Sequence, residues 1–179
     1  MYQGKNPKAL LSQRLLLEAL NALLKEKAFK EISVSELCER SGVSRQTFYS
    51  LFETKENILL YQLELVNDTK PEQEDTSALL LNDICERYSR YVTSNYALFS
   101  MLIENDLAEV LYKQFYQSMA SCRQSFVDLS DDEREYAALF MSAGLCQLTQ
   151  KYIREHAVPN AEELQQIAFR IMSGSIYRT

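Results

Sequence analysis

The sequence predicts an all-α protein of about nine helices, arranged as a small N-terminal head and a larger helical bundle. The chain of 179 residues holds only 4 glycines and 3 prolines, and so few helix-breaking residues favour helices throughout. Apolar residues recur at spacings of three and four in one segment after another, which is the helical period. Ser33 and Ser130 are each followed three residues later by a glutamate, a pattern that marks a helix start.

The segment of residues 32–55, ISVSELCERSGVSRQTFYSLFETK, predicts two short helices joined by a tight turn. Ser33 and Glu36 form a capping box, so the first helix is expected to begin near Val34. Gly42 stands where the chain must reverse, and glycine adopts the positive φ of such a turn at least cost. Ser44 is a favourable N-cap for the second helix.

In this second helix, Phe48 and Phe52 point toward the core by helical spacing, and polar residues are left outside. The outward set consists of Arg45, Gln46, Thr47, Tyr49 and Ser50. Arginine and glutamine form paired hydrogen bonds with base edges, and tyrosine reaches backbone phosphate. Lys55, in the first turn of the next predicted helix, lies beside free N–H groups that suit a phosphate. The pattern predicts a helix-turn-helix that binds a DNA major groove, although similar helix pairs occur in proteins that do not bind DNA.

Residues 15–63 resemble the DNA-binding domain of the TetR/AcrR family of transcriptional regulators. The matching pieces are LLLEALNALL, FKEISVSELCERSGVSRQTFYSLF and TKENILL. The resemblance implies that Ser33 and Val34 approach phosphate and that Tyr49 and Lys55 clamp the DNA backbone. It also implies that Arg45, Gln46, Thr47 and Ser50 face the groove. The predicted DNA-binding set is therefore Ser33, Val34, Ser44, Arg45, Gln46, Thr47, Tyr49, Ser50 and Lys55.

Two residues depart from the family's pattern. Ala28 stands where the family usually has glycine, and an alanine forced to positive φ would cost on the order of 1 kcal/mol. The first helix is therefore expected to end in another way. Leu51 stands where the family often has a histidine, which removes one possible phosphate contact.

The chain divides into a helix-turn-helix domain at 1–54, a linking helix at 55–69, and an effector-binding and dimerisation domain at 70–179. The polar stretch KPEQEDTS at 70–77 is the predicted boundary loop. Residues 1–60 carry a net charge of +2 and residues 61–179 a net charge of −8, so the head is the part suited to DNA. Residues 1–6 are predicted as a loose arm, with Lys5 and Lys8 close to DNA. Further helices are expected at about 7–27, 78–94, 96–103, 107–127, 130–156 and 160–172.

The last two helices are predicted to form a homodimer interface. The helix before His156 has apolar or small residues on more than one face, which indicates burial on both sides. Two such helices from each subunit would pack as a four-helix interface about a two-fold axis, as in the TetR family. The predicted interface residues are Leu139, Ala143, Gly144, Leu145, Leu164, Ile167, Ala168, Ile171 and Met172. The alternative is that these faces fill the core of a monomer.

The body is rich in aromatic residues, since nine of the eleven tyrosines lie beyond residue 60. A cavity between its helices would be lined by Tyr88, Tyr91, Phe99, Leu102, Phe115, Tyr116, Met119, Phe140 and Met141. The resemblance implies that such a cavity binds a small-molecule effector, which shifts the linking helix and the spacing of the two heads. The expected function is a dimeric repressor of a near-palindromic operator. The alternative is that each of these lining residues belongs to the packed core and contacts no ligand.

No other function class has support in the sequence. The four cysteines, Cys38, Cys85, Cys122 and Cys146, are far apart and the chain has one histidine, so no metal site or cofactor is expected. Buried thiols are the simplest reading, with a redox sensor at Cys122 or Cys146 as the alternative. No set of catalytic groups is present, and no signal peptide or membrane-spanning run is found, so a cytoplasmic protein is expected. A DNA-bound architectural or partner-recruiting protein without an effector remains the second hypothesis.

Overall fold

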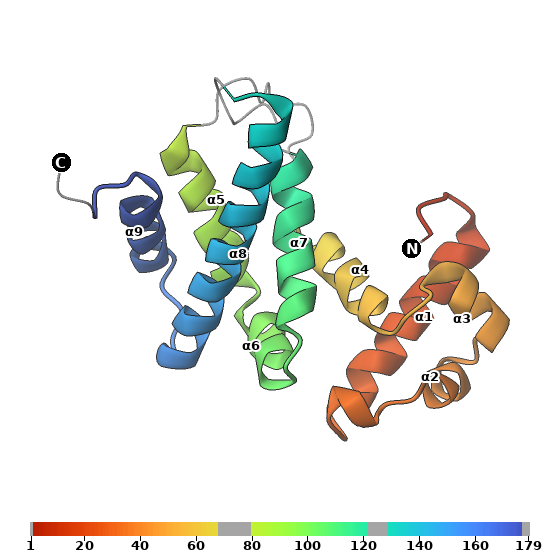
Figure 1. Cartoon of the computed structure of the whole chain (residues 1–179). Coiled ribbons are helices and arrows are strands. Elements are labelled where there is room, and N and C mark those ends of the chain that lie inside the picture. The colour runs from red at the N-terminus through yellow and green to blue at the C-terminus, as the bar shows by residue number, and fades with distance from the viewer. Residues whose placement is uncertain (1, 68–79, 122–128, 177–179) are drawn as a thin grey trace. The chain divides into compact units, whose positions relative to one another are not determined.

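The computed structural model describes residues 2–67, 80–121 and 129–176. Within these ranges the chain forms nine α-helices, one 3₁₀ helix and no β-strand, which confirms the predicted fold class (Figure 1). The chain divides into two compact units, Met1–Val66 and Asn67–Thr179. The predicted boundary loop at 70–77, the end of the helix expected at 107–127, and Cys122 lie outside the described residues.

The first unit, here called the head, contains α1 (Pro7–Leu23), α2 (Val34–Ser41), α3 (Arg45–Leu51) and α4 (Glu56–Val66). The side chain of Asn6 caps α1 by accepting from the N–H of Lys8, and Pro7 occupies the first helical position. α1 packs against the other three helices of the head. The head core consists of the fully or almost fully buried side chains Leu16, Leu20, Leu23, Leu37, Phe48, Phe52, Ile58, Leu59 and Leu63.

The connection between α1 and α2 explains the departure at residue 28. α1 ends at Leu23, one turn before the predicted end, and a short 3₁₀ helix, η1, covers Phe29–Glu31. Ala28 has φ −65° and ψ 148°, which is ordinary extended backbone. The chain therefore avoids the left-handed conformation that alanine disfavours, as expected.

The connection between α3 and α4 differs from the prediction. Glu53 takes φ 65°, a left-handed conformation that non-glycine residues rarely adopt. α4 begins at Glu56, so Lys55 precedes the first turn of this helix and does not lie in it as predicted. The N–H of Thr54 donates to the carbonyl oxygen of Phe52 at 2.7 Å, and the amide of Asn57 donates to the same oxygen at 2.6 Å. These two bonds hold the tight exit from α3.

The second unit, here called the body, contains α5 (Leu81–Ser94), α6 (Tyr96–Glu104), α7 (Ala108–Ser121), α8 (Asp131–Glu155) and α9 (Ala161–Met172). α7 lies along α8, and α5 packs against α9 (Figure 1). Ser130 and Glu133 form the predicted capping box at the start of α8, and Asn160 caps α9. Among the described residues, no helix combines the length and the apolar character that crossing a membrane requires.

Two helix ends in the body depart from the usual capping chemistry. Asn95 does not cap α6 with its side chain, because its amide donates to the carbonyl oxygen of Tyr91 in α5 at 2.9 Å. α6 ends through Asp106 at φ 59°. The N–H of Leu107 then donates to the carbonyl oxygen of Leu102 at 2.8 Å, a Schellman-type ending without glycine.

Candidate nucleic-acid interface

The turn between α2 and α3 has the geometry that the sequence predicts. Gly42 has φ 68°, in the left-handed region where glycine carries no steric cost. The side chain of Ser44 accepts from the N–H of Thr47 at 3.1 Å and so caps α3. Val43 is buried under the turn. These contacts fix the direction in which α3 leaves the turn.

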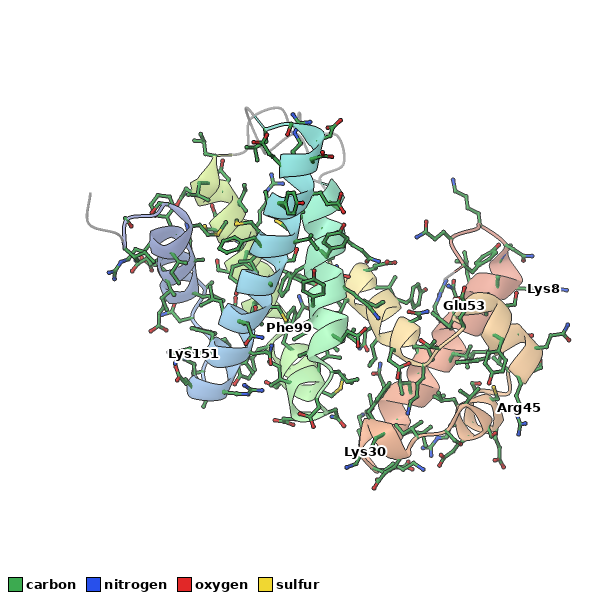
Figure 2. All side chains as sticks on the ribbon, in the orientation of Figure 1. Lys8, Lys30, Arg45, Glu53, Phe99 and Lys151 are labelled. Atoms are coloured by element: carbon green, nitrogen blue, oxygen red, sulfur yellow. The ribbon has the colours of Figure 1, made fainter. Side chains whose placement is uncertain are left out.

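α3 is held from one side only. Phe48 is completely buried and Leu51 almost completely, whereas Arg45, Gln46, Tyr49 and Ser50 are exposed. Figure 2 labels Arg45 on this outer face. The Tyr49 ring meets Phe48 edge-on with a centroid separation of 5.2 Å and is itself 54% exposed. The outer face therefore presents a guanidinium, an amide, a phenol and a hydroxyl, which are groups that hydrogen-bond to base edges and phosphates. Thr47 is half-buried, and its hydroxyl lies 2.8 Å from that of Ser44.

The N-terminus of α2 is the second predicted phosphate contact. Ser33 and Glu36 form a reciprocal capping box, so the Ser33 N–H is directed to the Glu36 carboxylate. The ammonium of Lys27 donates a hydrogen bond to the Glu36 carboxylate and forms an ion pair with it. This bond is the main reason why the pKa of the Glu36 carboxyl lies below its usual value. The capping box leaves the N–H groups of Val34 and Ser35, in the first turn of α2, as candidates for a phosphate.

Lys55 has partners that the sequence did not indicate. Its ammonium donates to the carbonyl oxygens of Phe29 at 2.7 Å and Ile32 at 2.8 Å, and lies 4.3 Å from the centroid of the Phe29 ring. Two of its three N–H donors are therefore used within the head. Only the third is left for the predicted phosphate contact.

The N-terminal arm is tied down, so the prediction of a loose arm is wrong. The N–H of Tyr2 donates to the carbonyl oxygen of Leu51, the last residue of α3, at 2.8 Å. The buried side chain of Gln13 in α1 donates to the carbonyl oxygen of Tyr2 at 3.1 Å. Gln13 is buried among the apolar residues of α1, and the sequence does not indicate the group to which it bonds.

The predicted effector-pocket residues fall into two groups. Tyr88, Tyr91, Phe99, Leu102 and Phe115 are buried in the body, while Tyr116, Met119 and Met141 are partly exposed. The buried rings touch: centroids are 5.3 Å apart for Tyr91 and Phe99 and 5.9 Å apart for Tyr88 and Phe115. Phe140 is 79% exposed, so its placement in this set is wrong. It follows the outer face of α8, because it lies four residues after the exposed Tyr136.

The predicted interface residues are also divided. Leu145, Leu164 and Ala168 are buried within the chain itself, so they do not lie on its surface and their assignment is wrong. Leu139, Ala143, Gly144 and Ile171 are exposed, while Ile167 and Met172 are partly exposed. Sequence reasoning missed Tyr136 and Phe169, two exposed aromatic residues on the same helices.

The head thus joins two short helices through a left-handed glycine and leaves the polar face of the second helix uncovered by its own unit. This geometry is that of a helix-turn-helix, the motif whose second helix enters a DNA major groove. The family model of bacterial regulatory proteins, tetR family, matches residues 16–61, which span α1 to the middle of α4. Residues 16–61 therefore carry a DNA-binding domain of the tetR family of bacterial regulatory proteins.

Relatives are similar over almost the whole length. The dhaKLM operon transcriptional activator DhaS of Lactococcus lactis subsp. lactis (strain IL1403) is 26% identical over 159 residues, which cover 82% of this chain and 81% of that protein. Lin0861 from Listeria innocua has the same fold with a TM-score of 0.73 at 15% identity, covering 98% of this chain and 95% of that one. A TetR-family regulator from Streptomyces coelicolor A3 gives a TM-score of 0.66 at 18% identity, with coverages of 96% and 98%.

Proposed function

We propose that this regulator is a homodimer whose two α3 helices enter successive major grooves of a near-palindromic operator. It acts by binding rather than by catalysis, in the cytoplasm, where a bacterial chromosome lies. The observation that carries the proposal is the outer face of α3, where Arg45 and Gln46 are exposed while Phe48 fixes the helix from behind. The proposed DNA contacts are Ser33, Val34, Ser44, Arg45, Gln46, Thr47, Tyr49, Ser50 and the third N–H of Lys55.

The proposed dimer uses the outer faces of α8 and α9. Tyr136, Leu139, Phe140 and Ala143 recur along α8 at spacings of three and four and are all exposed, so they form one apolar stripe. Gly144 has open space where a Cβ would stand, so a partner helix can approach the backbone closely there. Such a stripe is what a two-fold four-helix interface requires.

The proposed effector site lies among the buried aromatic residues of the body, around Tyr88, Phe99 and Phe115. Their rings provide apolar surface, and the Tyr88 hydroxyl, 2.8 Å from the Thr149 hydroxyl, provides a polar group. Thermal-shift screening of the purified protein against metabolites and drugs tests this proposal. A hit whose stabilisation disappears in Tyr88→Phe would support the site. If no compound raises the melting temperature, the effector proposal fails while the DNA-binding proposal stands.

Selection from random duplexes with the purified protein, followed by footprinting, tests the DNA-binding proposal. We expect two related half-sites whose centres are one helical turn, about 34 Å, or a multiple of it apart. A single unpaired half-site would contradict the dimeric arrangement. Failure to enrich any sequence would contradict specific recognition by α3.

The direction of regulation has two candidates. A regulator that covers its operator represses by blocking access to the promoter, and this is our first candidate. The relative from Lactococcus lactis is named as a transcriptional activator, which favours activation through a recruited partner as the second candidate. A promoter fusion measured with and without the regulator separates them: repression predicts higher expression in its absence, and activation predicts lower expression.

A further inference from the structure

The N-terminal arm, residues 2–6, is fastened to the recognition helix. The N–H of Tyr2 donates to Leu51 at the C-terminal end of α3, where a helix leaves carbonyl oxygens without intrahelical partners. From the other side, the amide of Gln13 donates to the carbonyl oxygen of Tyr2, and Gln13 itself is 1% exposed. A buried glutamine side chain needs such a partner, so this bond favours the docked arm.

The arm also folds back on itself. The N–H of Asn6 donates to the hydroxyl oxygen of Tyr2 at 3.2 Å, so the phenol ring turns toward the start of α1. Gly4 lies beneath this ring, and a Cβ at residue 4 would collide with the hydroxyl oxygen and the ring atoms of Tyr2. Residues 2–6 therefore form a hook in which a larger residue at position 4 would displace the Tyr2 ring.

Two lysines lie close to Tyr2 in the sequence: Lys5 in the hook and Lys8 in the first turn of α1. Lys5 and Lys8 are exposed, and neither ammonium forms an ion pair with any other residue of the described part of the chain. Figure 2 shows Lys8 extending from the same side of the head as Arg45, whereas Lys30 lies at the other end of the unit. Lys5 and Lys8 thus add positive charge to the part of the head that carries α3.

We propose that the hook and the first turn of α1 together form a second DNA-binding element, in which Lys5 of the hook and Lys8 of α1 bind phosphates at the rim of the groove that α3 enters. The inference rests on the proposed entry of α3 into the major groove. A helix of seven residues is only about 10 Å long, so both ends of α3 lie close to the groove that it enters. The hook is bonded to one of these ends. Because phosphates carry no base identity, this contact adds affinity and salt dependence without sequence preference.

The test measures the affinity of the full-length protein for its selected duplex between 50 and 200 mM salt. Each lost phosphate contact lowers the log–log salt slope by about 0.9, so Lys5→Ala/Lys8→Ala should lower it by roughly 1.8 per head. For two heads, raising the salt across this range should reduce the affinity of the variant by a factor that is roughly 100-fold smaller than the factor for the unaltered protein. Gly4→Val keeps both lysines but displaces the Tyr2 ring, and should weaken binding because Lys5 is no longer held in place.

The matched control is Lys25→Ala/Lys113→Ala, which removes the same charge from exposed positions beyond the far end of α1 and on α7. The inference is overturned if the Lys5/Lys8 variant has the slope and affinity of this control, or if its effect differs between duplexes of different flanking sequence. Melting temperatures of all variants establish that each remains folded. If the unaltered protein enriches no duplex, the proposed mode of DNA recognition fails instead, so the two failures are distinguishable.

Discussion

The ammonium of Lys55, just before α4, donates a 2.8 Å hydrogen bond to the carbonyl oxygen of Ile32, the residue before the N-cap of α2. A second bond, to Phe29, and the Phe29 ring beneath the ammonium complete the contact. The first turn of α2 provides the free N–H groups proposed to meet a phosphate. The start of α4 is therefore bonded directly to the chain that positions α2.

Lys55→Met tests this contact. It retains most of the side-chain length but removes both charge-assisted bonds, which should destabilise the DNA-free head by about 1–3 kcal/mol. DNA affinity should fall for specific and non-specific duplexes alike, because α2 is no longer held in place. Thermal melting and fluorescence anisotropy measure the two effects. Lys25→Met, at an exposed position, is the control, and an unchanged melting temperature for Lys55→Met would contradict the structural role.

Gln46→Ala tests recognition by α3. Gln46 is exposed, so its truncation should change the free energy of unfolding by less than about 0.5 kcal/mol. Affinity for the selected operator should fall by about 1–3 kcal/mol, with a relaxed preference at one base pair per half-site and an unchanged salt slope. Arg45→Ala should also relax preference. Repeating the sequence selection with each variant reads out the change, and an unaltered preferred sequence would remove that residue from the recognition set.

The local chemistry of the head could be predicted from sequence because each feature depends on neighbouring residues. Ser33 needs only Glu36 three residues later, and Gly42 needs only to follow a helix that must turn. The partners of Lys55 and Gln13 lie 23 and 11 residues away, and no local pattern indicates them. Glu53 and Asp106 show the same limit, since residues that rarely adopt positive φ do so here.

The site residues of the body were predicted less well for a related reason. α8 is apolar on more than one side, and periodicity alone does not say which side faces the chain's own core. Leu145 and Phe140 are both apolar and lie on the same helix, yet one is buried and the other exposed. The contact of α7 with α8 decides between them, and it depends on the tertiary structure.

Cys38, Cys85 and Cys146, the cysteines in the part of the chain that the structure describes, should resist alkylation in the folded protein. Burial raises the pKa of Cys85 to about 11 and also raises the pKa values of Cys38 and Cys146. Since only the thiolate reacts, far less than 1% of Cys85 is reactive at pH 8. Iodoacetamide labelling followed by peptide mapping should find these three thiols unmodified until denaturant is added. Rapid labelling of native Cys146 would instead favour the redox-sensor hypothesis.

Thr149→Val should destabilise the body. The Tyr88 hydroxyl lies 2.8 Å from that of Thr149, and its next partner, the carbonyl oxygen of Leu145, is at 3.5 Å. Removing the threonine hydroxyl leaves a buried phenol poorly paired, which costs about 1–3 kcal/mol. Adding Tyr88→Phe should recover part of this loss. A double-mutant cycle from urea unfolding measures the coupling, and strictly additive effects would show that the two hydroxyls do not stabilise each other.

Phe140→Glu tests the dimer surface. Phe140 is 79% exposed in the single chain, so a charge there costs little in the isolated subunit but would be placed against apolar side chains in the proposed interface. We expect the variant to sediment as a folded monomer at micromolar concentration and to bind the two-half-site operator at least 10-fold more weakly. Leu11→Glu, at a 57% exposed position of the head, is the control and should remain dimeric. A Phe140→Glu protein that stays dimeric would place the two-fold contact on another face, and the spacing of the two α3 helices would then have to be derived from that face.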